Sequence, residues 1–400
     1  MSFQKFLVQL AQAVQSENGP NLAFLLRPTS PHGRDIVKEL RNPTYQSMSY
    51  YKGSLEEPWD EIAIRYALVV AQVAKDRPAE AYKEEKLLVD NFYGYLQRHS
   101  GWTLPALFAI LRDLRDLAFD TSQQTECMED AARVISKAFG LCMTDRISPY
   151  GESRKWGVYY IVGLVFKSYF RVKRISLSKN ILRALENNAE IPALSEYPKA
   201  HQVTFRYYVG MLSFLNEDYA KAEQELTMAF YNCHIHAPRN HERILTYLIP
   251  LRILRGHLPT HELLQRFSSL NEMFSPFIAA IRLGDLRSFD VALERWELRL
   301  VELNLHLMLE KARELCMRSL FRRVWVISQK STRMPIALFH LALRSCDLDV
   351  PVEEAECYVA NMIYKGFMRG YVSHEKQMVV LAATNAFPRL ADRQSPFAVV

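Results

Sequence analysis

The sequence is short of glycine and cysteine, and both shortages narrow the range of folds. Only 14 of the 400 residues are glycine, which argues against a sandwich rich in tight turns. The six cysteines are scattered and form no Cys-x-x-Cys pair, so no disulfide framework is predicted. The longest apolar run, residues 159–166, is far shorter than the roughly 20 residues of a membrane span. We therefore expect an intracellular protein without membrane insertion.

The usual signatures of catalysis are also missing. No G-x-x-x-x-G-K-[ST], G-x-G-x-x-G or G-x-S-x-G motif occurs in the sequence. Cys233, His234, His236 and His241 carry atoms that suit a soft metal, but Cys233 and His234 are adjacent and point in different directions from a helix. We expect a non-enzymatic protein with no catalytic residues, no cofactor, no metal and no small-molecule substrate.

Helical periodicity takes over at about residue 58 and persists for most of the chain. Residues 203–231 form the clearest unit, with two helices joined by a turn at residues 216–218. Its small alanines and the tyrosine that opens the second helix resemble a tetratricopeptide (TPR) unit. Because such helix pairs bury their faces only against neighbouring pairs, the pattern predicts a right-handed helical-repeat, TPR-like solenoid.

The pattern changes after about residue 333. A short helix at 335–344 and a helix at 352–365 precede two strands, at 367–372 and 377–382. Helices followed by a β-hairpin are typical of a winged helix, so the fold class is mainly α. We divide the chain into an irregular N-terminal segment with a short helix (1–57), a helical-repeat solenoid (58–332), and a winged-helix subdomain with a tail (333–400).

Positive charge is concentrated in the last quarter of the chain. Residues 311–400 contain 13 Lys and Arg against 8 Asp and Glu. Lys and Arg in a winged helix neutralise phosphates whatever the base sequence, although basic residues that merely solvate the surface are an alternative interpretation. Glu353, Glu354 and Glu356 would be repelled by a phosphate backbone, so a helix that reads the DNA major groove is not expected. The candidates for nucleic-acid binding are Arg318, Arg322, Arg323, Lys330, Arg333, Lys365, Arg369 and Lys376.

The C-terminal sequence resembles a known family. Residues 360–376, ANMIYKGFMRGYVSHEK, and the later segments MVVL at 378–381 and NAFP at 385–388 are similar to the end of the PCI-domain export subunits. This family comprises PCI domain-containing protein 2 in animals and the Thp-type subunits of fungi. Ala386 departs from the usual Asn-Pro-Phe-Pro. Other matching stretches follow in order over roughly residues 58–400, at 155–157, 204–210, 247–250, 254–260 and 318–321.

The resemblance implies a fold, partners and a cellular role. The end of the solenoid and the winged helix would together form a PCI domain in a non-enzymatic subunit of the second nuclear transcription-coupled mRNA export (TREX) complex, at the nuclear pore or envelope. Its partners would be a larger PCI scaffold of the Sac or GANP type, a small acidic protein of the Dss or Sem type, and RNA or DNA. The alternative is a PCI subunit of a COP9 signalosome-type or proteasome-lid-type assembly without a nucleic-acid role. Partner contacts are expected at Tyr364, Phe367, Tyr371 and His374.

Overall fold

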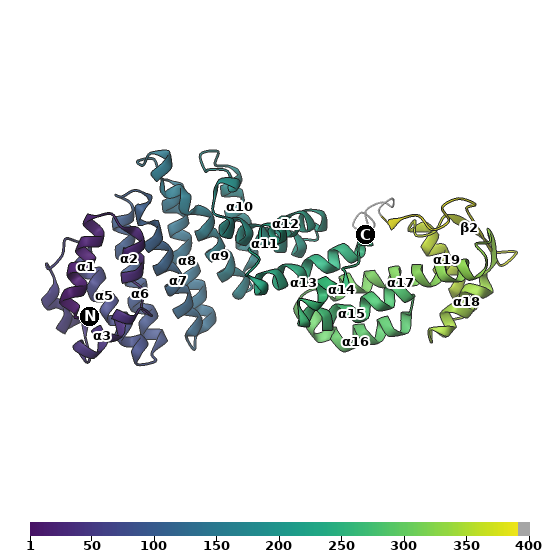
Figure 1. Cartoon of the computed structure of the whole chain (residues 1–400), viewed down its shortest axis with the longest axis horizontal. Helices are drawn as coiled ribbons and strands as arrows, with labels where there is room; N and C mark the ends of the chain where they lie inside the picture. The colour runs from purple at the N-terminus through teal and green to yellow at the C-terminus, as the bar shows by residue number, and fades with distance from the viewer. Residues whose placement is uncertain (391–400) are drawn as a thin grey trace. The chain divides into compact units, whose positions relative to one another are not determined.

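The computed structural model describes residues 1–390, which are mainly helical. Nineteen α-helices and one three-stranded β-sheet occur within these residues. The chain divides into two compact units, the first comprising Met1–Tyr208 and the second beginning at Val209 (Figure 1). The predicted mainly α fold class is therefore confirmed.

The first unit is a stack of helices that follow the order of the chain (Figure 1). Each helix from α5 to α9 contacts the next one, as expected for an array of helical hairpins. The helices are α1 (Phe3–Gln15), α2 (Gly19–Leu25), α3 (Pro31–Leu40), α4 (Tyr45–Met48), α5 (Trp59–Ala74), α6 (Pro78–Leu96), α7 (Leu104–Asp120), α8 (Gln124–Met143), α9 (Val158–Arg171), α10 (Ser178–Glu186) and the first part of α11 (Lys199–Leu215).

Residues 1–57 are more regular than the sequence predicts, because they contain four α-helices instead of one short helix. The sequence Asn18-Gly19-Pro20, whose residue types indicate a chain break, is a helix start, where the side chain of Asn18 accepts a hydrogen bond from a backbone N–H of α2. Pro31 likewise occupies the first turn of α3. The segment is also packed against the array, since the buried ring of Phe6 stacks on Tyr66 of α5 at 4.9 Å.

The second unit is organised around one long helix, α17. It contacts α13, α15, α16 and α18. A Cβ placed on Gly284, which has a φ of 68°, would lie 2.5 Å from the backbone nitrogen of Leu320. Glycine is therefore required where the turn after α15 approaches α17. The helices are α12 (Tyr219–Asn232), α13 (Pro238–Leu254), α14 (His261–Gln265), α15 (Ser268–Leu283), α16 (Leu286–Glu302), α17 (His306–Ile327), α18 (Ile336–Ser345) and α19 (Val352–Tyr364).

The C-terminal β-hairpin is present, together with a third strand that the sequence does not predict. The antiparallel strands are β1 (Arg333–Pro335), β2 (Gly370–Ser373) and β3 (Met378–Leu381), and β3 lies in the middle. Three residues are too few to show an alternating pattern, and Pro335 is assigned to a helix in the sequence prediction, so β1 is missed. Together with α18 and α19, the sheet forms a winged-helix module.

Two aspects of the predicted organisation stay predictions. The division of the chain at residue 208 separates two compact units, and it does not test boundaries at 57 and 332. The right-handed sense of the helical repeat is also a prediction. Within residues 1–390, no helix combines the length and apolar character needed to cross a bilayer.

Candidate functional site

The sheet of the winged-helix module has one buried face and one outer face. Met334 pairs with Val379, and these side chains are 1% and 0% exposed. Neighbouring residues in a strand point to opposite faces. The adjacent row, which contains Arg333, Val380 and Tyr371, therefore lies on the outer face. The register thus brings together two residues that are 38 positions apart, an arginine and a 62% exposed tyrosine.

Close packing of the strands at Gly370 sets the position of Arg369. A Cβ on Gly370 would lie 2.2 Å from the carbonyl oxygen of Val380, so a side chain here would push β2 away from β3. The backbone N–H of Arg369 donates to the carbonyl oxygen of Ala386 at 2.8 Å, and its own carbonyl accepts from the N–H of Ala382 at 2.8 Å. Main-chain bonds therefore fix Arg369 immediately before β2, with its side chain exposed.

The turn between β2 and β3 is attached to α19. The ring Nδ1 of His374 lies 2.9 Å from both carboxylate oxygens of Glu356, and the side-chain amide of Gln377 donates to the same carboxylate at 3.4 Å. His374, a predicted partner contact, is thus engaged within the module. Glu356, predicted to repel phosphate, is largely covered by these contacts, whereas Lys376 in the turn is exposed.

The three predicted arginines of α17 have different surroundings. Arg318 donates from Nη2 to the carbonyl oxygen of Pro388 at 2.8 Å and so attaches α17 to the segment after β3. Arg323 donates from Nη1 to the carbonyl oxygen of Leu283, at the C-terminal end of α15. Arg322 is exposed. Two of the three arginines therefore have structural contacts that the sequence does not predict.

Lys365, Lys330 and Arg333 also differ in how accessible they are. Lys365, directly after α19, forms an ion pair with Glu314 of α17 and is partly covered. Lys330 follows α17 and is exposed, and so is Arg333 in β1. The exposed members of the predicted basic set are Arg322, Arg323, Lys330, Arg333, Arg369 and Lys376.

Phe367, a predicted partner contact, is 2% exposed and belongs to the core of the module. The end of α19 explains this position. The N–H of Phe367 donates to the carbonyl of Met362 at 2.9 Å, and the N–H of Gly366 donates to the carbonyl of Ile363 at 3.0 Å. This is a Schellman motif, which turns the residue two positions beyond the cap back toward the helix. Tyr364, by contrast, is 84% exposed.

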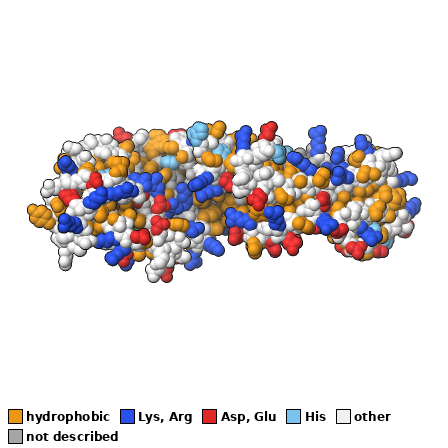
Figure 2. Space-filling model, turned by 60° about the horizontal axis from the view of Figure 1, so that its bottom comes forward, with side chains coloured by type: hydrophobic (Ala, Val, Ile, Leu, Met, Phe, Trp, Pro, Cys, Tyr) orange, Lys and Arg blue, Asp and Glu red, His pale blue; other side chains and the backbone are white. Residues whose placement is uncertain are grey.

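Sequence reasoning misses several exposed apolar side chains in the same region. Ile327 at the end of α17 is 81% exposed, and Leu341 on α18 is 64% exposed. For α18 the sequence pattern could have indicated this exposure, because Leu338 and Leu341 are three residues apart and both lie on the side of the helix away from its buried Phe339. Figure 2 shows hydrophobic side chains interspersed with Lys and Arg on one face of the molecule.

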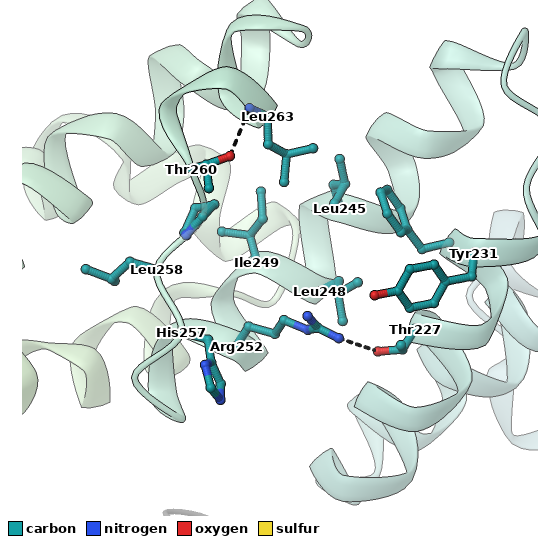
Figure 3. Close-up of a pocket in the computed structure, with 12 residues that line it drawn as sticks. Thr227, Tyr231, Leu245, Leu248, Ile249, Arg252, His257, Leu258, Thr260 and Leu263 are labelled. Carbon is teal, nitrogen blue, oxygen red and sulfur yellow. Dashed lines mark hydrogen bonds between the residues drawn. The ribbon is translucent and has the colours of Figure 1, made fainter. Parts of the chain in front are cut away.

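A separate apolar pocket of about 230 Å³ lies between α12, α13 and the segment that ends in α14 (Figure 3). Its walls include Leu245, Leu248 and Ile249. Three of the polar groups at its edge are used by the fold: the Nη2 of Arg252 donates to the hydroxyl of Thr227 at 3.2 Å, and the hydroxyl of Thr260 caps α14 by accepting from the N–H of Leu263. The pocket therefore suits an apolar side chain better than a polar small molecule.

The cysteine and histidines near residue 236 engage the backbone and one another. The rings of His234 and His236 are 5.3 Å apart, and Nδ1 of His241 lies 3.2 Å from the carbonyl oxygen of Ala237. In the part of the chain that the structure describes, no three or more His, Cys, Asp or Glu side chains are grouped so that they could hold a metal ion.

The C-terminal module matches a known domain family. A model of the PCI domain matches residues 293–382. The chain is 40% identical over 358 residues to the protein CSN12 homolog of Schizosaccharomyces pombe, covering 84% of each chain, and 31% identical over 403 residues to PCI domain-containing protein 2 of Xenopus laevis, covering 98% of each chain. The chain belongs to the family of PCI domain-containing protein 2 and the CSN12 homologs. A PCI domain-containing protein 2 homolog of Drosophila melanogaster is 32% identical over 397 residues, which are 96% of this chain and 98% of the relative.

The resemblance seen in the sequence is thereby confirmed. In this PCI protein, the matched domain begins within α16 and ends directly after β3. All twelve residues that the sequence predicts for nucleic-acid or partner binding lie inside the match. The PCI domain thus includes α17, which connects the preceding helices to the winged-helix module.

Proposed function

We propose that this PCI protein is a non-enzymatic scaffold subunit of the nuclear transcription-coupled mRNA export complex and acts at the nuclear pore or envelope. The observation that carries the nucleic-acid part is the set of exposed basic side chains on and beside the outer face of the winged-helix sheet, namely Arg333, Arg369 and Lys376. Such groups bind phosphates through charge, without regard to base sequence.

The proposed partners are a larger PCI scaffold of the Sac or GANP type and a small acidic protein of the Dss or Sem type. The resemblance to the export subunits suggests both. Exposed apolar side chains such as Ile327, Leu341 and Tyr364 support a protein contact, because they lose contact with water when a partner covers them. The non-enzymatic role is supported by the absence of known catalytic motifs from the sequence.

The test measures the affinity of the chain for a fluorescent RNA by anisotropy, at two salt concentrations, with the chain alone and after it has been assembled with its scaffold. We expect weak, salt-sensitive binding by the chain and tighter binding by the complex. The charge-reversal variant R322E/R333E/K376E should weaken binding and lower the salt slope by about 2, because each phosphate contact to a single strand contributes roughly 0.7.

A matched control has the same change in net charge at exposed positions of the first unit, K75E/K83E/K179E. It should leave RNA affinity nearly unchanged. If both triple variants bind RNA with the affinity of the original chain, the nucleic-acid proposal fails. Co-purification with a signalosome-type or lid-type assembly would then favour the alternative scaffold role.

A further inference from the structure

The outer face of the winged-helix sheet combines an apolar floor with an exposed aromatic ring. One row across the three strands contains Arg333, Val380 and Tyr371, and two residues further along, Met378 occupies the same face of the central strand. Val380 and Met378 are partly exposed, and Tyr371 is 62% exposed. The face therefore offers a surface on which a planar group could lie.

We propose that this face binds single-stranded nucleic acid, with one base stacked on the ring of Tyr371 and a neighbouring phosphate held by Arg333. The inference rests on the proposed nucleic-acid function and specifies its substrate class. The two residues lie on the edge strands, so their Cα atoms are about 10 Å apart, which is two inter-strand spacings of roughly 4.8 Å. Stacking on an aromatic ring is available to every base and requires no sequence.

Charge complementarity favours a nucleic acid over a protein as the occupant. The segments that form and flank the sheet, residues 330–335 and 369–381, contain Lys330, Arg333, Arg369 and Lys376 but only one acidic residue, Glu375. All four basic side chains are exposed. A strand that carries one negative charge per nucleotide can pair with several of these groups while a base covers the apolar floor.

Base stacking and the placement of charge both favour a single strand over a duplex. In a duplex, the bases are already stacked on one another, so none is available for Tyr371. The usual duplex-reading element of a winged helix would be a helix, yet α19 begins with the exposed carboxylates of Glu353 and Glu354. If α19 entered a duplex groove, these carboxylates would lie close to the phosphates and repel them. A single strand bound on the sheet face would not contact these carboxylates.

The experiment compares a labelled oligouridine with a duplex RNA of equal length, using the full chain at fixed salt and anisotropy as the readout. Y371A should weaken binding of the single strand roughly 5- to 150-fold, as expected when one base loses its stacking partner. Y371F should retain most of the affinity, because it keeps the ring. Duplex binding should be weaker and respond little to either variant.

The control variant is Y50A, which removes an even more exposed tyrosine, 87% exposed, from the first unit. It should leave oligouridine affinity unchanged. If R333A weakens binding but Y371A does not, the stacking inference is wrong while the nucleic-acid function stands. If Y371A instead disrupts assembly with the scaffold and leaves oligouridine affinity intact, the face is a protein contact. If neither RNA binds, the proposed function and this inference fail together.

Discussion

At the scale of single residues, Asp145 and Arg154 form a buried ion pair in the first unit. The carboxylate of Asp145 accepts from Nη2 of Arg154 at 3.2 Å, from its backbone N–H at 2.8 Å and from the hydroxyl of Ser153 at 2.9 Å. Arg154 also donates from Nη1 to the carbonyl oxygen of Leu96 at 2.7 Å. This network ties the loop before α9 to the end of α6.

Replacing Asp145 by Asn should lower the free energy of unfolding by roughly 3–5 kcal/mol, because the buried guanidinium would lose its counter-charge. Burial alone would raise the pKa of Asp145, but hydrogen bonds from Arg154 and Ser153 outweigh burial and hold the pKa below its ordinary range. The carboxylate therefore stabilises the fold above about pH 4, and this contribution is lost as the pH falls further. Urea unfolding between pH 3 and 7 would show this dependence, and D145N should lack it.

In contrast to Asp145, Glu85 of α6 is a buried carboxyl group whose pKa is raised. Its side chain is fully buried, and neither carboxylate oxygen has a hydrogen-bond partner among residues 1–390. Burial, and then the charge of Asp113, raise the pKa of Glu85 well above its ordinary value. When the pKa of an acid is higher in the folded protein than in the unfolded chain, its contribution to stability is fully present at pH values below the pKa of the unfolded chain. This contribution is lost as the pH rises through the pKa of the folded protein.

Replacing Glu85 by Gln should therefore raise the free energy of unfolding at pH 8 by roughly 1–3 kcal/mol, since the amide cannot ionise. The gain should shrink toward pH 4, where the carboxyl is neutral in both states. Thermal unfolding across this pH range measures the difference. Glu80, which is exposed on the same helix, provides the control: E80Q should change stability by only a few tenths of a kcal/mol. Equal effects of the two substitutions would contradict the interpretation.

At the scale of elements, the three-stranded sheet depends on the close approach of β2 and β3 at Gly370. Substituting Ala should cost more than about 1 kcal/mol, because the added Cβ would meet the carbonyl oxygen of Val380 at 2.2 Å. Hydrogen exchange should then be faster in residues 370–381. Apart from the neighbouring backbone of α6, no atom of the described residues lies within 4 Å of a Cβ added to Gly94, so G94A should be neutral or stabilise α6 by up to about 1 kcal/mol. Unaltered exchange in G370A would show that the strands can adjust.

The helices of the array could be predicted from sequence, but the short helices of the first 57 residues and strand β1 could not. The turn at residues 216–218 and the helices on either side of it are confirmed, because their apolar positions repeat every three to four residues. In the first 57 residues, Gly19, Pro20 and Pro31, whose residue types indicate breaks, lie in the first turns of α2 and α3. Strand β1 is stabilised by its pairing with β3, a contact more than 40 residues away in sequence.

The residue types of the candidate site were predictable, whereas their surroundings were not. Basic side chains are visible in any sequence, and six of the eight are exposed. The contact of Arg318 with Pro388 and that of Lys365 with Glu314 join segments that are 70 and 51 positions apart. A local sequence pattern cannot predict contacts between residues that are so far apart in the chain. Phe367 shows the same limit, since its burial depends on how the chain turns after α19.

At the scale of the whole molecule, the exposed apolar side chains of the PCI domain should make the isolated chain prone to self-association. The variant I327S/L341S should be more soluble alone and bind its scaffold at least tenfold more weakly, because two apolar anchors are lost. Sedimentation and titration with the scaffold measure the two effects. Val8 and Ile147 in the first unit are 57% and 77% exposed, and V8S/I147S should leave scaffold affinity unchanged. Equal losses in both variants would rule out a specific contact.

The long helix α17 has a consequence for how this family can change over time. It is an uninterrupted 22-residue helix that packs on α13, α15 and α16 and also on α18 of the winged-helix module. Each residue added to or removed from a helix rotates everything beyond it by about 100° and shifts it by about 1.5 Å. Substitutions along α17 leave this angular phase intact, whereas one inserted residue would rotate the basic sheet relative to the helices that pack on the first part of α17. The length of α17 should therefore be inherited more strictly than its sequence.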